Sequence, residues 1–209
     1  MKKTLFLILL PFISAFGQTQ NEYSLNLYVG KSISTFGFVN STGVKTENTA
    51  FKNGDTYSAD FEIQIAEKHL LMPGLMFHQA GAISDDGVGD MEWELDYLGI
   101  QYGYGYNILN KERFSMAPTL FLGADYLVKG IQTVGTTRYD VKAIDAFKDW
   151  NFRTNIGLNS RLRVAEYMSL VLDYRFNISL NQIEKKDADI NQKTRNLGHL
   201  ISLGLNINF

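Results

Sequence analysis

The end of the chain alternates between two kinds of side chain. One face carries Leu197, His199, Ile201, Leu203, Leu205, Ile207 and Phe209, whereas glycine and polar residues dominate the other. This period of two indicates a β-strand with one apolar face. Seven earlier segments alternate in the same way, at 23–33, 57–66, 71–80, 93–106, 114–129, 150–164 and 168–180. Most of these segments reach the roughly 9–11 residues of a tilted strand that crosses a membrane.

We therefore predict an all-β fold, a single eight-stranded antiparallel up-and-down barrel. A count of ten strands stays open if residues 138–144 pair independently. Short connections at 67–70, 107–113 and 165–167 alternate with long ones at 37–56, 81–92, 130–149 and 181–195. In membrane barrels short turns face the periplasm and long loops face outside. The pattern thus predicts a transmembrane barrel with both termini at the periplasmic end.

The N-terminus has the features of an export signal. Lys2 and Lys3 precede an apolar run at 5–16, and Ala15-Phe16-Gly17 before Gln18 offers a small-x-small cleavage site. We expect a signal peptide at 1–17 and a barrel domain at 18–209. The apolar run is shorter than the roughly 18 residues that a spanning helix needs, which argues against an inner-membrane helical protein.

Composition excludes several functional classes. The 20 basic and 22 acidic residues give a net charge of −2, without the basic character of a nucleic-acid-binding protein. The chain has no cysteine, so disulfides, thiolate metal sites and attachment of lipid to a cysteine are impossible. Mean hydropathy is −0.13, as expected when only alternate residues meet lipid.

Charged residues in the predicted strands share the face that is opposite to the apolar one. They are the acids Asp60, Glu62, Asp125 and Asp173 and the bases Lys129, Arg153, Arg161, Arg163 and Arg175. An Arg or Lys on the lipid face at the midplane would cost about 2–4 kcal/mol, which orients this face inward. Because an eight-stranded barrel holds little more than its own side chains, we expect a closed lumen. We predict a charge network that links Asp60, Glu62, Asp125 and Asp173 to Arg153, Arg161 and Arg175.

Aromatic residues gather toward the ends of the strands, as in the girdles of membrane barrels. The predicted outer girdle contains Trp93, Tyr126, Trp150, Phe152 and Phe176, and the periplasmic girdle contains Tyr23, Tyr106, Phe114, Tyr167 and Phe209. Apolar residues change phase within 93–106, from odd to even positions, which predicts a β-bulge near Asp96 and Tyr97. Gly99, Gln101, Gly103 and Gly105 then face the lumen.

The sequence resembles the small outer-membrane β-barrel proteins, including the OmpA/OmpX-like barrels and the PorT-like family. The resemblance covers 23–209 and rests on Gly17-Gln18, on Tyr97-Leu98-Gly99-Ile100 and on the terminal residues 205–209. It implies a monomeric, non-enzymatic protein of the cell outer membrane, surrounded by lipid and lipopolysaccharide. The implied role is envelope integrity, adhesion or assistance to secretion. Phe209 resembles the signal that the barrel-assembly machinery recognises, and we expect no peptidoglycan-binding domain after the barrel.

Three other functions stay open: a lipid A-modifying enzyme, a narrow channel, and a soluble lipocalin-like binder. An enzyme would need a pairing such as His199 with Ser202, but an offset of three residues places these on opposite faces of a strand. We expect His78 to face the lumen and His69 to lie in a turn. We predict no catalytic residue, cofactor or metal, although the acidic segment 85–92 could hold Ca²⁺. Aromatic residues of the first and third long loops could contact a partner or lipopolysaccharide: Phe36, Phe38, Phe51, Tyr139 and Phe147.

Overall fold

The computed structural model describes residues 22–39, 45–46, 49–85, 90–185 and 193–209. The predicted signal peptide lies outside these residues, as does part of the acidic segment 85–92. Eight long strands form the wall: β1 (Glu22–Val39), β3 (Thr49–Ala66), β4 (His69–Asp85), β5 (Asp90–Tyr106), β7 (Phe114–Val134), β9 (Trp150–Ala165), β10 (Met168–Ser179) and β11 (Lys193–Asn208). Three short strands are β2 (Lys45–Thr46), β6 (Leu109–Asn110) and β8 (Thr137–Asp140).

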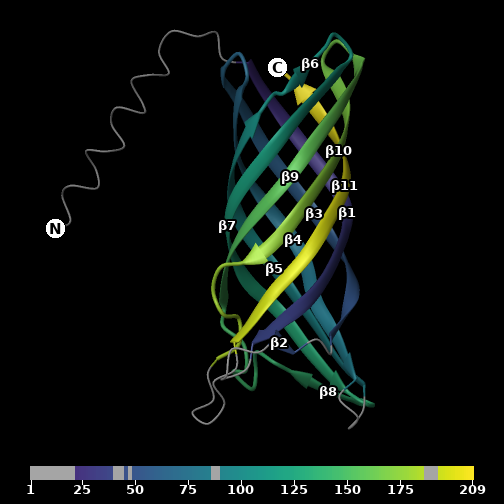
Figure 1. The fold of residues 1–209 in the computed structure, drawn as a ribbon, viewed down its shortest axis with the longest axis vertical. Helices are drawn as coiled ribbons and strands as arrows, with labels where there is room; N and C mark the ends of the chain where they lie inside the picture. The colour runs from purple at the N-terminus through teal and green to yellow at the C-terminus, as the bar shows by residue number, and fades with distance from the viewer. Residues whose placement is uncertain (1–21, 40–44, 47–48, 86–89, 186–192) are drawn as a thin grey trace, which may run out of the picture.

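The eight long strands close into a cylinder (Figure 1). Each pairs antiparallel with its neighbours in the order β1, β3, β4, β5, β7, β9, β10, β11, and β11 pairs with β1 to complete the ring. The closing ladder places Leu205 opposite Leu27. The prediction of an eight-stranded barrel is confirmed, and the segment 138–144 contributes only to the short β8 beside β7. A closed ring leaves no wall strand with an open edge.

The two ends of the cylinder differ. Phe209, Glu22 and the short turns lie at one end, beside β6, and β2 and β8 lie at the other (Figure 1). We call these the periplasmic end and the outer end, because short turns face the periplasm in such barrels. No helix among the described residues is long and apolar enough to span a membrane.

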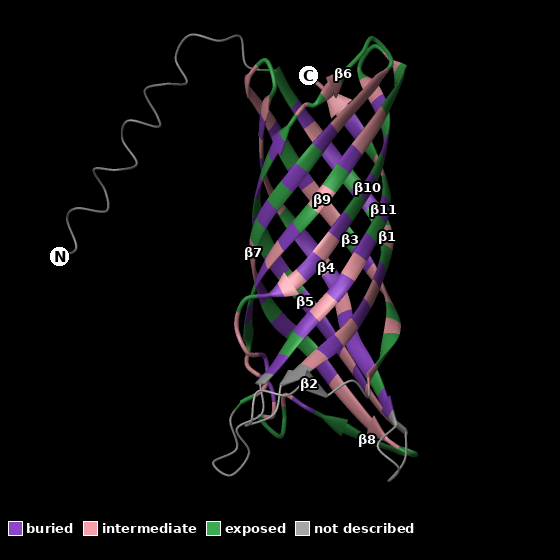
Figure 2. Cartoon of the chain, in the orientation of Figure 1, coloured by how far each residue is buried: buried purple, intermediate pink, exposed green. Residues whose placement is uncertain are grey.

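Burial alternates along each wall strand (Figure 2). Outward positions through the middle of the barrel are apolar and exposed: Val29, Ile100 and Leu203 are 57%, 63% and 65% exposed. Inward positions there carry buried polar groups such as Asn26, Asp60 and Asn155. An apolar outside around a polar inside is the arrangement of a membrane barrel, whereas a soluble barrel has the reverse.

The outer third of the barrel reverses this arrangement. Its interior holds a hydrophobic cluster, which we call the apolar cap: Phe36, Ala80, Ala82, Trp93, Leu95, Tyr97, Leu127, Val141, Phe147 and Ile183. Its outside carries charged groups, since Lys52 pairs with Glu92 and lies 3.5 Å from Glu94. The wall strands therefore continue beyond the apolar belt. The prediction that 37–56, 81–92 and 130–149 are loops was wrong for much of their length, because strands outside lipid no longer need an apolar outer face.

The apolar cap explains the phase change in β5. Odd-numbered residues of β5, including Trp93, Tyr97 and Gln101, face inward throughout. A register shift does occur at Asp96 and Tyr97, but β7 supplies the extra residue, Val128, between the partners Leu127 and Lys129. Two predictions were therefore wrong. Trp93 belongs to the cap and not to the outer girdle, and Lys129 faces outward.

Apart from Trp93, the aromatic residues predicted for the two girdles lie on the outside of the barrel, near its two ends. Near the outer end the Tyr126 and Trp150 rings lie 5.4 Å apart, and the Tyr57 and Phe77 rings lie 6.1 Å apart. At the periplasmic end Tyr23 stacks on Phe61 at 5.8 Å. Such rings favour the boundary between lipid and water.

Candidate functional site

The closed lumen is the first candidate site. The wall strands deliver its charged side chains because each occupies an inward position of the alternating pattern: β3 contributes two acids, β7 one acid, β9 two arginines, and β10 one of each. The structure places all seven residues of the predicted network inside the barrel: Asp60, Glu62, Asp125, Asp173, Arg153, Arg161 and Arg175. Burial of these charges requires close partners, because an unpaired ion in the interior is costly.

Arg175 lies at the centre of the lumen between two acids. Its Nε donates to Asp173 Oδ2 at 2.6 Å, and its Nη2 donates to Asp60 Oδ2 at 3.1 Å. The guanidinium also lies 3.9 Å from the centroid of the Phe121 ring. These contacts hold the cation on three sides, so the side chain obstructs the lumen.

A second ion pair lies nearer the outer end. Arg153 Nε donates to Asp125 Oδ2 at 2.8 Å, and neither side chain has exposed surface. Gln101 joins this pair to the central one, because it accepts a bond from Arg153 Nη2 at 3.1 Å and donates to Asp60 Oδ1 at 2.6 Å. The two ion pairs are thus one connected network.

A third ion pair closes the periplasmic side of the network. Arg161 binds Glu62 with two nitrogens, and its Nη1 lies 2.7 Å from Glu62 Oε1. Asn159 links this pair to the centre, since it accepts from Arg161 Nε at 2.8 Å and donates to Asp173 Oδ1 at 3.0 Å. The sequence did not predict the two amide linkers, Gln101 and Asn159. A buried charge needs a partner of opposite charge, whereas a neutral amide side chain has no such requirement, so its partners cannot be inferred.

Glycines on the inward face make room for the network. A Cβ at Gly99 would overlap Asp125 Oδ1, and one at Gly74 would overlap Asp60 Oδ1. A Cβ at Gly123 would lie 2.9 Å from Arg153 Cζ, which is closer than real contacts allow. The lumen is therefore filled by long charged side chains that lie against glycine on neighbouring strands.

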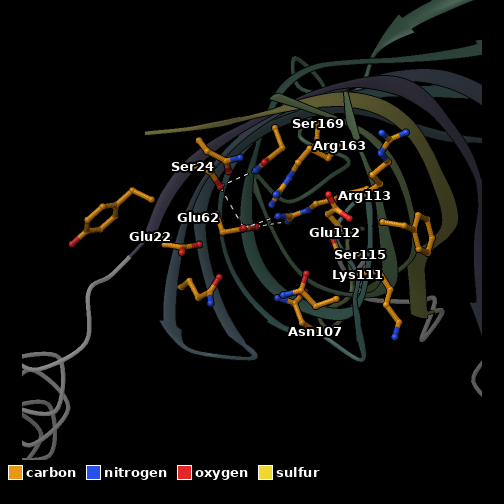
Figure 3. Close-up of a pocket in the computed structure, with 17 residues that line it drawn as sticks. Glu22, Ser24, Glu62, Asn107, Lys111, Glu112, Arg113, Ser115, Arg163 and Ser169 are labelled. Atoms are coloured by element: carbon orange, nitrogen blue, oxygen red, sulfur yellow. Dashed lines mark hydrogen bonds and ion pairs between the residues drawn. The ribbon is translucent and has the colours of Figure 1, made fainter. Parts of the chain in front are cut away.

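The periplasmic mouth is the second candidate site, and it is hollow (Figure 3). A cavity of about 100 Å³ opens at this end, and the Arg161–Glu62 pair lines it on the side of the lumen. Most lining side chains are charged or carry hydroxyl or amide groups, among them Ser24, Ser169, Asn206 and Arg163. Arg163, which the sequence placed among the inward bases, is exposed at this mouth.

The histidines lie in three separate environments. His78 is buried and stacks on Tyr97, with ring centroids 5.3 Å apart. His199 faces outward, where its Nδ1 lies 2.8 Å from the Tyr174 hydroxyl. Ser202 is buried on the opposite face of β11 from His199. His69 is in β4 and not in a turn, with its Nδ1 2.6 Å from the Tyr104 hydroxyl.

The aromatic residues predicted to lie in the long loops differ in their exposure to a partner. Phe36 and Phe147 are buried in the apolar cap, so the prediction that they contact a partner was wrong. Phe51 and Tyr139 are exposed. In the part of the chain that the structure describes, no group of three or more His, Asp or Glu side chains could hold a metal ion.

Comparison with known proteins gives the fold. No family model matches the sequence, and no curated protein matches it. The structure is similar to neisserial surface protein A, with a TM-score of 0.53 and 11% identity over 90% of this chain and 97% of that chain. It is similar to a major outer membrane protein from Thermus thermophilus, with a TM-score of 0.53 and 12% identity over 91% of this chain and 100% of that chain. The chain therefore has the fold of small outer-membrane β-barrel proteins, and its apolar belt suits that membrane.

Proposed function

We propose that this outer-membrane β-barrel is a monomeric, non-enzymatic and non-conducting protein with a structural or interaction role. Envelope integrity, adhesion and assistance to secretion all fit a rigid cylinder that displays its outer end. The closed lumen is the observation that carries the proposal. Four side chains of the network are at most 3% exposed: Arg153, Asp125, Arg175 and Asp60. The apolar cap lies between them and the outer end of the barrel.

Two barriers of different chemistry support the absence of conduction. The buried ion-pair network occupies the middle of the lumen, and an ion that passed would have to separate paired charges at low dielectric. Beyond it the apolar cap surrounds the path of an ion mostly with hydrocarbon side chains. The third and fourth loops hold the cap in place, because Lys148 N donates to Ile183 O at 2.7 Å and Lys185 N donates to Ala146 O at 2.9 Å.

Phe209 is the candidate signal for barrel assembly. This residue is 77% exposed, and its backbone N donates to Tyr23 O at 3.0 Å, which ties the C-terminus to the closing seam. An exposed terminal aromatic contributes little packing to the folded barrel. We propose that the barrel-assembly machinery recognises this residue. We also propose that lipid and lipopolysaccharide surround the apolar outside of the folded barrel.

Conductance in planar lipid bilayers tests the proposed closed lumen. Wild-type protein inserted from detergent should give no steady conductance steps at moderate voltage, and an established porin in the same bilayers serves as the positive control. Reproducible steps from the wild-type protein would contradict the proposal and favour the narrow channel. A shift in lipid A mass between cells with and without the gene would instead favour the lipid-modifying enzyme.

A further inference from the structure

We propose that the periplasmic mouth binds the terminal carboxylate of an extended peptide through Arg113 and Arg163. Both residues line the cavity of about 100 Å³ described above (Figure 3). Such a site goes beyond a structural role, since it assigns a ligand to the end of the barrel that faces the periplasm. It leaves the sealed network untouched, because the Arg161–Glu62 pair separates the cavity from the lumen.

The two arginines start from adjoining positions on the rim. Arg113 immediately precedes β7, Arg163 lies in β9, and the Arg163 backbone N donates to Arg113 O at 2.8 Å. Both side chains are exposed, and neither forms an ion pair within the described residues. The buried arginines of the lumen, by contrast, each bind a carboxylate. A planar guanidinium binds a carboxylate with two parallel hydrogen bonds, so an arginine that has no acidic partner favours this group.

Strand register directs these side chains into the mouth. Arg163 shares the inward face of β9 with Asn159 and Arg161, and Arg113 is in phase with the inward Ser115. Both arginines also border a groove on the outside of the rim, beside Leu162 and Val164. A ligand in the cavity itself reaches them along the barrel axis, from the periplasm.

The remainder of the lining suits a peptide. Ser169 and Asn208 supply hydroxyl and amide groups that can both donate and accept hydrogen bonds. These groups complement the N–H and C=O groups of a peptide backbone. Asn206 is held in position, since its Nδ2 donates to Ser24 Oγ at 2.8 Å.

The charges of the lining limit the ligand to few negative groups. Once Arg161 and Glu62 are paired, Lys111, Arg113 and Arg163 face Glu22 and Glu112, an excess of one positive charge. A single carboxylate among neutral amides balances this excess. A polyphosphate or another polyanion would be repelled by Glu22 and Glu112.

The test is an NMR titration of the folded mature barrel in phosphatidylcholine nanodiscs. The probe is acetyl-trialanine with a free carboxyl terminus, and the matched probe is the same peptide as its terminal amide. We expect the acid to shift the backbone signals of Arg113, Arg163 and Ser169, and the amide to shift none. The Arg113→Gln/Arg163→Gln double variant should lose about tenfold or more in affinity, as expected for the loss of two charge-assisted contacts.

Arg138→Gln is the control, because Arg138 is an exposed arginine in β8 at the opposite end of the barrel. This variant should bind the acid like the wild type, and all variants should keep the gel mobility of the folded barrel. Equal binding of acid and amide would overturn the proposal, as would equal affinity of the double variant and the wild type. Inorganic phosphate that competes more strongly than the peptide would also overturn it in favour of a general anion site.

Discussion

Arg153 Nε lies 2.8 Å from Asp125 Oδ2 in the interior of the barrel, where neither side chain has exposed surface. Arg153 also binds Gln101, so one guanidinium connects the outer acid to the central pair. A buried ion pair adds little net stability, because both ions lose their hydration. Removal of one partner is costly, because it leaves the other charge buried and unpaired.

Replacement of Arg153 in the Arg153–Asp125 pair should destabilise the folded barrel. Arg153→Met leaves the Asp125 carboxylate without its cation and should lower the free energy of unfolding by about 3–5 kcal/mol. Urea unfolding in detergent micelles measures the change. Lys185→Met is the control, since Lys185 forms an exposed ion pair with Asp145 and its loss should cost about 1 kcal/mol or less. Equal stability of Arg153→Met and the wild type would show that the network does not stabilise the fold.

Gly99 lies opposite Asp125 on the neighbouring strand, with no room for a side chain. Gly99→Ala should force the carboxylate away from Arg153 and destabilise the barrel by about 1–3 kcal/mol. Gly105→Ala is the matched control in the same strand, because its Cβ would meet the flexible end of Met72 at 3.1 Å. The same unfolding measurement compares the two variants, and a smaller loss at Gly99 than at Gly105 would show that the close approach of Gly99 to Asp125 is unimportant.

The apolar cap should open without unfolding of the barrel. Phe147 packs on Phe36 with ring centroids 6.2 Å apart, and Phe36 packs on Trp93 at 5.6 Å. In a Trp150→Phe background, where Trp93 is the only tryptophan, Phe147→Ala should increase quenching of its fluorescence by iodide. Phe51→Ala, at an exposed position, should leave quenching unchanged. Unchanged quenching in Phe147→Ala would mean that the loops do not shield the outer mouth.

Glu184 makes the loop closure depend on pH. Burial raises the pKa of its carboxyl above the ordinary 4.5, and the hydrogen bond from Thr194 opposes this shift only in part. A raised folded pKa favours the folded state below pH 4.5, and this contribution is lost as pH rises through the folded pKa. Glu184→Gln should therefore be more stable than the wild type at neutral pH and lose this advantage in acid. Parallel urea titrations at both pH values check the sign, and a variant destabilised only at neutral pH would contradict it.

Phe209 should affect assembly more than stability. Phe209→Ala removes a side chain that is 77% exposed, so the free energy of unfolding in detergent should change by less than about 1 kcal/mol. In cells, the same variant should show less folded protein in the outer membrane. Phe51→Ala, another exposed aromatic, is the control and should assemble normally. Normal assembly of Phe209→Ala would remove the proposed role of this residue as a signal.

Alternation in the sequence was enough to predict the eight strands and the inward position of the seven charged residues of the network. A period of two tells which residues share a face, but it does not tell where along a strand lipid ends. Trp93, Phe36 and Phe147 were therefore assigned to the outside or to free loops, although they form the interior of the outer end. Lys129 was misplaced because one extra residue in β7 reverses the alternation beyond it.

The partners within the network could not be predicted from the sequence. Pairing depends on the stagger of strands around the ring, which brings Arg175 of β10 to Asp60 of β3 across the lumen. The linkers Gln101 and Asn159 were missed because neutral amides give no energetic reason to expect a particular partner. Charge determines which face turns inward, whereas geometry determines which charges meet.

Electrophoresis of the outer-membrane fraction, with and without boiling, distinguishes an integral membrane barrel from a soluble one. A folded membrane barrel resists SDS and migrates faster than its unfolded chain. We expect two mobilities in this fraction, with the faster band lost on boiling. A single band that does not respond to heat, found in the soluble periplasmic fraction, would contradict an integral outer-membrane barrel and support a soluble binder.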